Sequence, residues 1–492
     1  GVRNGAKVDA GRVLSVQAET DETVVNVGVT GYGGGAAGAG GSAAVNVVTS
    51  TTSAFIGDAD INQAATTSTE RSVEVTADSN SNLIAVAGSG GGAGAAAVGG
   101  VPTVNALAKK TTALIGEGAT VAADDNVIVD ATSAQNIISA GISIQGAGAA
   151  AVGGAATVNV VANTTEAYIG SARDDATKTA AAVDSDGNVV VAASDDTLLI
   201  AVAGSGTGAV AAAVGGAVGA NVISSQTRAY VGDNSVVNAR GNSAGTTVAT
   251  GTTDNAAAGA MPSLPSGVSS AVDADRDGTN DGNIGNGASF TLAGGGTSTG
   301  VNPSSIKDSG GSSVGSALGG IGAKGTETAK GLSVTATGNE KIVSAAIGVA
   351  GAGAAGVTGT ATADIIASKT EARIGDGAQI NQSGAVSADS DVRVRAADNS
   401  FVVMTSGTVA GAAGAGVSGS ANVAVIAKET HATIGDADIK AGDVIVRAVA
   451  KEDAYVIDAN VSFGAAGVGG AVGAAGVTND TQAGIAAGAT GD

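Results

Sequence analysis

A repeat of invariant internal length constrains the fold of this 492-residue chain more than any other feature. Seven units open on an alternating apolar pattern that ends in Ala, and six of them close on Thr-x-Ala-x-Ile/Val-Gly. The opening Ala and the closing Gly are always 39 residues apart, as in Ala18 to Gly57. The openings are Leu14–Ala18, Val73–Ala77, Val127–Ala131, Val189–Ala193, Leu332–Ala336, Val392–Ala396 and Val444–Ala448. The closings are Thr52–Gly57, Thr111–Gly116, Thr165–Gly170, Thr227–Gly232, Thr370–Gly375 and Thr430–Gly435, while Thr481–Ala486 lacks the Gly.

Length varies only between units. From one closing Gly to the next opening Ala, the separations are 20, 15, 23, 104, 21 and 13 residues. A constant core with one variable connection per unit is typical of stacked repeats, in which insertions leave the register of the rungs unchanged. The sequence therefore predicts three regions: repeats one to four over 1–238, a Gly/Ser/Thr/Asp-rich insertion over 239–331, and repeats five to seven over 332–492.

The local patterns favour strands throughout the core. The openings alternate with period two, and the later apolar runs are rich in Val and Ile, whereas the Gly/Ala tracts between them disfavour helix. We expect an opening strand, a polar turn such as Asp78–Asn82, an apolar run, a Gly/Ala tract such as Gly146–Gly154, and a second run. The predicted fold class is all-β, a β-solenoid of seven repeats of about 50–60 residues with a close-packed Gly/Ala-rich core and one long inserted loop. Each unit forms either one wide turn or several smaller rungs.

Composition excludes several classes of function. The net charge of −21 repels phosphate backbones, so nucleic acid is not an expected partner. The chain has no cysteine, which excludes disulfides, a thiolate zinc site and a cysteine nucleophile. Aromatic residues make up only 2% of the chain, so the core must be built from Ala, Val and Ile.

One motif indicates a cation site. Within the insertion, the segment Asp273–Gly282 reads DADRDGTNDG, and its oxygens at Asp273, Asp275, Asp277, Thr279 and Asp281 have the spacing of a calcium loop. Position twelve is Ile284 instead of the Glu that an EF-hand requires. The motif is therefore closer to the calcium repeats of extracellular proteins, and calcium is the predicted cofactor. The alternative is a solvated acidic loop.

Recurring polar residues favour structural roles. An acidic residue follows the closing Gly at Asp58, Glu117, Asp233, Asp376 and Asp436, which indicates either a column of stacked carboxylates or, preferably, a surface turn in which Gly supplies an unusual dihedral angle. The single histidine, His431, lies at a variable, exposed position of the closing motif, and no GxSxG motif accompanies it. We therefore predict no catalytic residue and no enzyme.

The repeats resemble those of giant secreted bacterial surface proteins, the filamentous haemagglutinin and leukotoxin-like adhesins. The resemblance rests on TEAYIGSA from Thr165, TRAYVGDNSVV from Thr227, TEARIGDGAQI from Thr370 and HATIGDADIK from His431, each followed by a V-x-V-x-A strand. It implies export across a Gram-negative envelope, a right-handed β-solenoid shaft, and a role in adhesion, biofilm matrix or delivery of a toxic tip.

The leading hypothesis is accordingly a structural shaft of an extracellular filament or adhesin at the bacterial cell surface. Its expected partners are other copies of itself, end to end or laterally, and an unidentified receptor on a host or bacterial surface. A membrane-active, leukotoxin-like segment is the alternative, suggested by the uncharged stretch from Ala131 to Thr165. A third reading, a flat row of Thr51, Thr111, Thr164 and similar residues that binds glycan or ice, lacks the aromatic residues that stack on sugars.

Overall fold

The computed structural model describes residues 1–64, 70–172, 179–253 and 324–491. The predicted calcium ligands at Asp273, Asp275, Asp277, Thr279 and Asp281 lie outside these ranges. The chain divides into two compact units, residues 1–252 with 325–492, and residues 253–324. The first unit contains the repeats and is described below.

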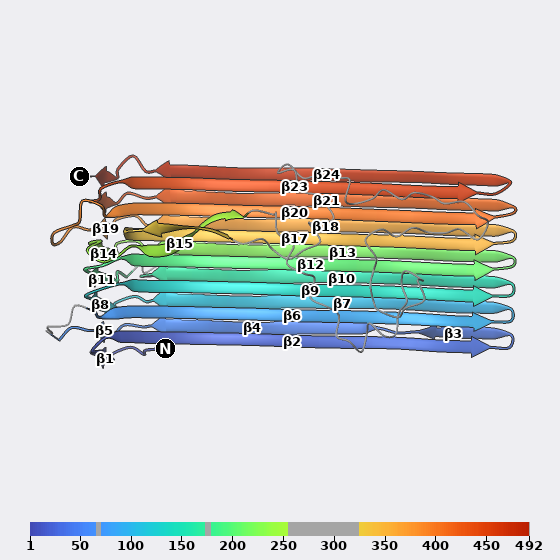
Figure 1. Cartoon of the computed structure of the whole chain (residues 1–492), viewed down its shortest axis with the longest axis horizontal. Coiled ribbons are helices and arrows are strands. Elements are labelled where there is room, and N and C mark those ends of the chain that lie inside the picture. The colour runs from blue at the N-terminus through green and yellow to red at the C-terminus, as the bar shows by residue number, and fades with distance from the viewer. Residues whose placement is uncertain (65–69, 173–178, 254–323, 492) are drawn as a thin grey trace. The chain divides into compact units, whose positions relative to one another are not determined.

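The first unit, which contains all seven repeats, consists of two parallel sheets of long strands and one sheet of short strands (Figure 1). The opening sheet contains β2 (Val13–Gly34), β6 (Ser72–Ala93), β9 (Val127–Ala147), β12 (Val189–Ala209), β17 (Gly331–Ala352), β20 (Asp391–Ala412) and β23 (Val444–Phe463). The closing sheet contains β3 (Ala37–Gly41), β4 (Ala44–Ile56), β7 (Ala96–Ile115), β10 (Ala150–Ile169), β13 (Ala212–Val231), β18 (Ala355–Ile374), β21 (Ala415–Ile434) and β24 (Ala466–Ile485). The fold class predicted from the repeat is confirmed: the protein is an all-β solenoid.

The third sheet, called the corner sheet, closes each turn of the chain with a strand of two to four residues. Its strands are β1 (Lys7–Val8), β5 (Asp60–Ile61), β8 (Thr120–Ala123), β11 (Ala182–Ser185), β14 (Val236–Ala239), β19 (Gln379–Ile380), β22 (Asp438–Ile439) and β25 (Thr490–Gly491). Between β14 and β17, β15 (Thr246–Thr253) and β16 (Lys324–Ala329) pair as a separate two-stranded sheet.

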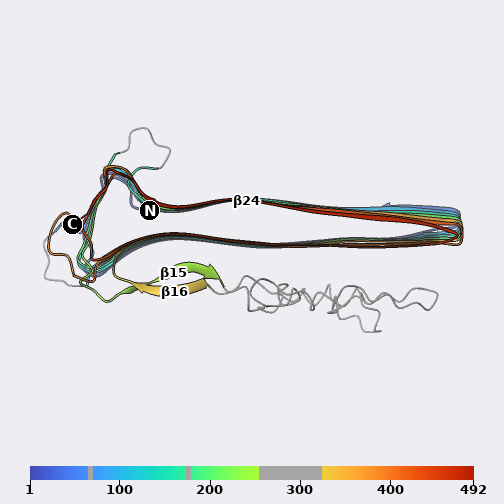
Figure 2. The same cartoon turned by 90° about the horizontal axis from the view of Figure 1, so that it is seen from above.

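Each sequence repeat makes one complete rung. The chain runs along the opening sheet, reverses over two residues such as Gly94 and Ala95, and returns along the closing sheet (Figure 2). The register between rungs is continuous, so that Val73 pairs with Val127 and Thr111 with Thr165. The question of rung number is therefore resolved in favour of one wide turn per repeat.

The reversal lies within the Gly/Ala tract, and the predicted polar turns are wrong. Asp78–Asn82 and its equivalents lie in the middle of continuous strands of 20 to 22 residues. Alternate side chains of these segments enter the space between the two sheets, where Ser79 and Ser81 are buried. A run of polar residues is typical of a turn. Here their side chains instead form hydrogen bonds with residues of the facing sheet and of adjacent rungs.

The apolar core consists of separate bands along the strands. One band fills the wide end between all three sheets and includes Val75, Ile115 and Val121. A second band lies between the two long sheets and includes Leu83 and Val161. Because every rung contributes the same positions, each band continues from one rung to the next, and polar residues occupy the space between the bands.

Candidate functional site

The acidic residues after the closing glycines connect adjacent rungs. The backbone N–H of Asp376 donates to Asp233 Oδ1 at 2.9 Å, and that of Asp436 donates to Asp376 Oδ1 at 3.0 Å. Arg373 Nη2 lies 3.4 Å from Asp233 Oδ1 and 2.9 Å from Asp376 Oδ2, which offsets their repulsion. This column is therefore held by backbone amides and a guanidinium group.

The acidic residues lie in turns or bends, as predicted, but the reason for the closing glycine differs from the predicted one. Among the six closing glycines only Gly170 has a positive φ, of 96°. At Gly375 an added Cβ would lie 2.3 Å from Asp233 Oδ1, and at Gly435 it would lie 2.2 Å from Asp376 Oδ1. Glycine is needed here because the acidic side chain of the preceding rung approaches the backbone closely.

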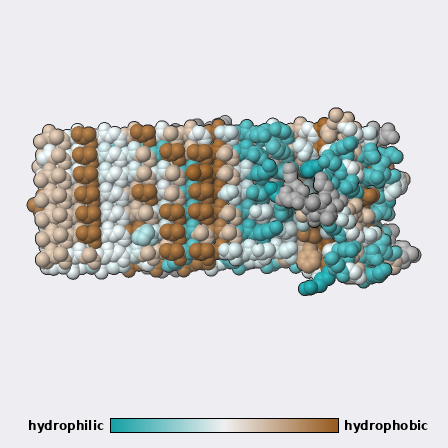
Figure 3. Space-filling model, turned by 180° about the vertical axis from the view of Figure 1, so that it is seen from behind, coloured by the Kyte–Doolittle hydropathy of each residue, from teal (hydrophilic) through white to brown (hydrophobic). Residues whose placement is uncertain are grey.

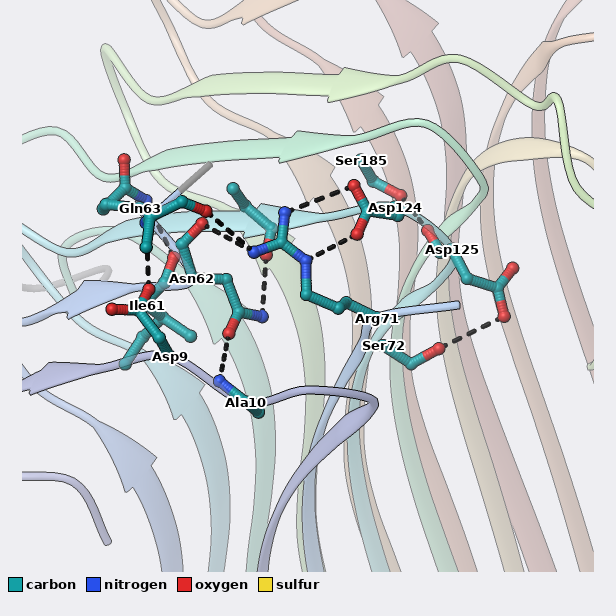
Figure 4. A network of polar contacts seen from close by, with 12 residues as sticks. Asp9, Ala10, Ile61, Asn62, Gln63, Arg71, Ser72, Asp124, Asp125 and Ser185 are labelled. Carbon is teal, nitrogen blue, oxygen red and sulfur yellow. Dashed lines mark hydrogen bonds and ion pairs between the residues drawn. The ribbon is translucent and has the colours of Figure 1, made fainter. Parts of the chain in front are cut away.

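Asparagine side chains fasten the corner of the stack (Figure 4). Asn62, at a φ of 58°, accepts from the backbone N–H of Ala10 at 2.8 Å and donates to the carbonyl of Ala122 at 3.0 Å. Its equivalent, Asn381, accepts from Ala239 and donates to Lys440 in the same way. Each asparagine thus connects three consecutive rungs, which is a structural role.

A buried arginine completes the same corner. Arg71 donates to both carboxylate oxygens of Asp124, at 2.5 and 3.2 Å, and to the carbonyls of Asn62 and Ala64 at 3.2 and 3.3 Å (Figure 4). The hydrogen bonds to Asp124 raise the pKa of Arg71. The guanidinium group is therefore occupied by the chain itself, and it joins the start of β6 to the residues that directly follow β5.

The closing threonines face inward. Thr111, Thr165 and Thr430 are fully buried between the long sheets, and their equivalents Thr52, Thr227 and Thr370 are nearly so. Thr51 and Thr164 belong to the neighbouring outward column, which continues with Lys110, Gln226, Lys369 and Glu429. The flat row of threonines is therefore wrong, because its members point to different sides of the sheet.

His431 is half-buried, whereas the sequence predicted an exposed position. Its Nε2 lies 3.1 Å from Asp480 Oδ2 on the next rung. Within the ranges that the structure describes, no three His, Cys, Asp or Glu side chains come together in a group that could hold a metal ion. The acidic and basic side chains instead recur along the stack.

Two buried polar bands lie on either side of the apolar band that contains Leu83 and Val161, and sequence reasoning missed both. In one, an amide ladder runs through the closing sheet: Asn46 donates to Asn105 at 2.8 Å, Asn105 to Asn159 at 2.7 Å, Asn159 to Asn221 at 2.7 Å, and Asn221 to Asp364 Oδ1 at 2.7 Å. The available signal was an Asn at the same place in four consecutive repeats.

The other polar band contains charged groups. Lys428 contacts Asp398 Oδ1, its Nζ lies 3.9 Å from Glu340 Oε2, and all three side chains are completely buried. Burial, followed by repulsion from Asp398, raises the pKa of Glu340 well above its usual range. For Asp398, burial alone raises the pKa, but the charge of Lys428 and several hydrogen bonds together lower it below the ordinary value. The cluster therefore pairs Lys428 with Asp398 beside a second carboxyl, Glu340, whose burial favours its neutral form.

A second ion pair occupies the same band near the first rungs. Lys109 Nζ lies 3.3 Å from Glu22 Oε2 and donates to Ser81 Oγ at 2.6 Å. Burial lowers the pKa of Lys109, although Glu22 acts in the opposite direction. Both lysines lie between the long sheets, and because Lys109 and Lys428 are only 4% and 3% exposed, neither presents a cationic site to solvent.

The outer surface of the closing sheet carries the most distinctive exposed feature (Figure 3). On each rung, the closing sheet begins at the two-residue reversal. Counted along the strand from that reversal, the first seven residues whose side chains point away from the opening sheet carry no charge. We call this region the apolar face; its segments are Ala37–Thr49, Ala96–Ala108, Ala150–Ala162, Ala212–Ser224, Ala355–Ala367, Ala415–Ala427 and Ala466–Thr478. It is the best candidate for an interaction surface, because isolated soluble chains rarely expose continuous apolar patches of such extent.

Among the described residues, no helix is long and apolar enough to cross a membrane. The uncharged stretch from Ala131 to Thr165 forms most of β9 and β10, which belong to different sheets.

No family model, curated protein or solved structure matches the chain.

Proposed function

We propose that the protein is a structural shaft segment of an extracellular bacterial surface filament or adhesin, which extends from the cell and presents loops for attachment. The observation that carries the proposal is that each repeat forms one complete rung in register with the next. A stack of this kind grows in one direction as repeats are added, by about 4.8 Å per rung.

The position of the variable segments supports the same function. The connections that differ in length between repeats, such as those over 58–71 and 171–188, begin after a closing strand and end before an opening strand, at the corner end of the rungs. Loops of any length can therefore be displayed along one edge without disturbing the long sheets. A shaft that presents variable loops would use this separation between a constant scaffold and its variable edge.

The self-association expected of a shaft has a physical basis at the ends of the stack. Val477 and Ile485 of β24, the outermost strand of the closing sheet, are in register with the buried Ile426 and Ile434 but are themselves 52% and 54% exposed. The outer backbone groups of such a strand offer a template for pairing with another chain. We therefore expect end-to-end stacking in concentrated solution.

Cryo-electron microscopy of the purified 492-residue chain tests the shaft proposal. We expect rods that lengthen with protein concentration, have a constant cross-section, and show an axial repeat of about 4.8 Å from the strands. Antibodies raised against the same chain should label filaments on unpermeabilised cells of the source organism. Compact or ring-shaped particles at every concentration, or labelling only after permeabilisation, would contradict the proposal.

Calcium binding by Asp273, Asp275, Asp277, Thr279 and Asp281 stays a prediction. Isothermal titration of the intact chain with CaCl₂ should show binding with a dissociation constant of about 0.1–1 mM, as in extracellular calcium modules. The double variant Asp275→Asn and Asp277→Asn should lose this binding. A matched pair of substitutions outside the motif, Asp389→Asn and Asp443→Asn, should retain it; equal heats in both variants would refute the assignment.

A further inference from the structure

The glycines of the apolar face form a column that runs through all seven rungs. Its members are Gly41, Gly100, Gly154, Gly216, Gly359, Gly419 and Gly470, joined in register by the ladders of the closing sheet. Next to it runs a column of valines, in which Val98 is 51% exposed, Val417 is 40% exposed and Val468 is 62% exposed. A shallow groove over the glycines is bordered by Val218 and Ala361.

The chain's own packing does not explain most of these glycines. An added Cβ would meet nothing within 4 Å at Gly100 or Gly470, and its nearest neighbours at Gly359 and Gly419 would be 3.9 and 3.8 Å away. None of the seven has a positive φ. A glycine within a strand weakens it, and close approach of another backbone or ligand is one of the established reasons for its presence.

The outward side of the closing sheet is also electrically neutral, although the chain carries a net charge of −21. Its outward strand residues include four cations and four anions: Lys110, Arg228, Lys369 and Arg373 against Glu166, Glu371, Glu429 and Asp480. All eight lie beyond the apolar face, toward the corner. Two copies can therefore bring these surfaces together without the repulsion that the acidic remainder of the chain would create.

We propose that the apolar face binds the apolar face of a second copy of this chain. Seven strands about 4.8 Å apart and about 13 residues per strand at 3.3 Å each give an area of roughly 1,400 Å² per copy. A stable interface of standard size needs about 800 Å² per partner. The area is therefore sufficient even when the two faces overlap only in part.

The arrangement of columns selects the symmetry of the pair. A two-fold axis parallel to the strands would place glycine over glycine and valine over valine. A two-fold axis parallel to the stack reverses the order of columns, so that the glycine column of each copy faces the partner column that contains Val104, Val158 and Val423. The second arrangement places side chains over the groove, and it leaves the charged residues in solvent beyond the partner's reversal end.

This pairing deepens the proposed shaft function, because it names the surface by which two shafts associate laterally. It does not involve the ends of the stack. Electron micrographs distinguish the two proposals: single rods would leave the shaft standing and contradict the pairing, whereas the absence of rods would contradict the shaft.

Single cysteines test the symmetry, because the chain has none of its own. Ala361 lies in the middle column and faces Ala361 of the second copy across the axis. Ala361→Cys should therefore form an intermolecular disulfide under mild oxidation, visible as a dimer on a non-reducing gel. Ala355→Cys is the matched control, because the two cysteines would be about 40 Å apart in the pair. Equal cross-linking of both variants, or of neither, would overturn the arrangement.

Charge on the apolar face tests the interface itself. We expect the unmodified chain to sediment as a dimer at micromolar concentration, and the double variant Val357→Glu and Val417→Glu to raise the dissociation constant at least about 100-fold, because it buries unpaired carboxylates. Gln226→Glu, on the same sheet but outside the apolar face, should leave the dimer intact. Circular dichroism of all three should coincide, which shows that the fold is retained.

A dimer unaffected by the two glutamates would overturn the proposal. So would an unmodified chain that stays monomeric at 100 µM. A monomer that floats with phosphatidylcholine vesicles would assign the apolar face to a lipid surface instead, and would favour the membrane-active alternative.

Discussion

Replacement of Lys428 by Met should lower the free energy of unfolding by about 3–5 kcal/mol at pH 7, the usual cost of removing one partner of a buried ion pair. Lys428 and Asp398 are completely enclosed between the long sheets. Met keeps much of the length of the lysine side chain but carries no charge. The substitution therefore leaves the Asp398 carboxylate buried without its cation.

The remaining partners cannot compensate for this loss. Ser368 and Thr370 already donate to Asp398 Oδ2, at 2.9 and 2.8 Å. The other acid of the cluster, Glu340, accepts from Ser225 at 2.6 Å and from Ser400 at 3.1 Å, and it supplies no positive charge that could replace Lys428. Without Lys428, the effect of burial on Asp398 is no longer offset by a neighbouring charge, so the pKa of Asp398 should rise in the folded variant. The deficit in stability should consequently shrink as the pH is lowered toward 4.

Lys369→Met provides a matched control one rung away. Lys369 Nζ lies 2.5 Å from Glu429 Oε2, but the two side chains are 33% and 50% exposed. Surface ion pairs contribute about 0–1 kcal/mol, so this variant should unfold nearly as the parent does. Urea titration followed by far-ultraviolet circular dichroism provides the comparison, since the chain lacks tryptophan. Equal losses in the two variants would show that burial does not govern the effect.

Asp364→Asn should have the second largest effect, and in the opposite direction. Asp364 ends the amide ladder, and burial raises its pKa to about 6 although Ser344 and Asn221 donate to it. Retaining a charge there at pH 7 costs at most about 3 kcal/mol, calculated from the difference between 3.8 and about 6. Asn continues the ladder without that charge, with the Ser344 hydroxyl as acceptor. We expect a gain of about 2–3 kcal/mol at pH 7.

The pH dependence has a definite sign. Between about pH 4 and pH 6, the folded state retains a proton on Asp364 that the unfolded state has released. The free energy of unfolding of the parent chain therefore falls as the pH rises through this range, and this contribution is constant above it. Asp364→Asn removes the dependence, so the two chains should differ at pH 7 and converge near pH 4.

An exposed aspartate serves as the control for this prediction. The Asp389 side chain is 78% exposed, and Asp389→Asn should change stability by less than about 0.5 kcal/mol at either pH. Thermal and urea unfolding at pH 4, 5, 6 and 7 measure all three chains. A parent chain that becomes more stable between pH 4 and 6 relative to Asp364→Asn would contradict the assignment.

The interior polar bands mark the limit of sequence reasoning on this chain. Asp78–Asn82 resembles a turn because Asp, Asn and Ser bond to their own backbone in loops. In the stack, Ser81 instead donates to Glu22 and receives a hydrogen bond from Lys109, which are 59 and 28 residues away. Partners at such separations cannot be recognised in a local pattern. The sequence therefore predicts a turn within a strand that is in fact continuous.

The apolar face could in principle be predicted from the sequence. Val98, Gly100 and their equivalents recur at fixed places after each reversal, and alternation along a strand places them on one side. Without the position of the reversal, however, the Gly/Ala tract indicates only close packing of small residues. Its division into inward and outward columns requires the location of the two-residue turn at Gly94 and Ala95 and its equivalents.

The amino-acid sequence by itself determined the repeat, its strand-forming character and the single place in each unit where length varies, because stacking in register requires equal rungs and tolerates loops at one edge. Tertiary structure decided that each repeat is one rung, that Lys428 and Asp398 meet inside it, and which valines stay exposed. The physical reason is that these properties depend on which side of a strand faces another sheet. Only the contacts between distant rungs and sheets establish that orientation.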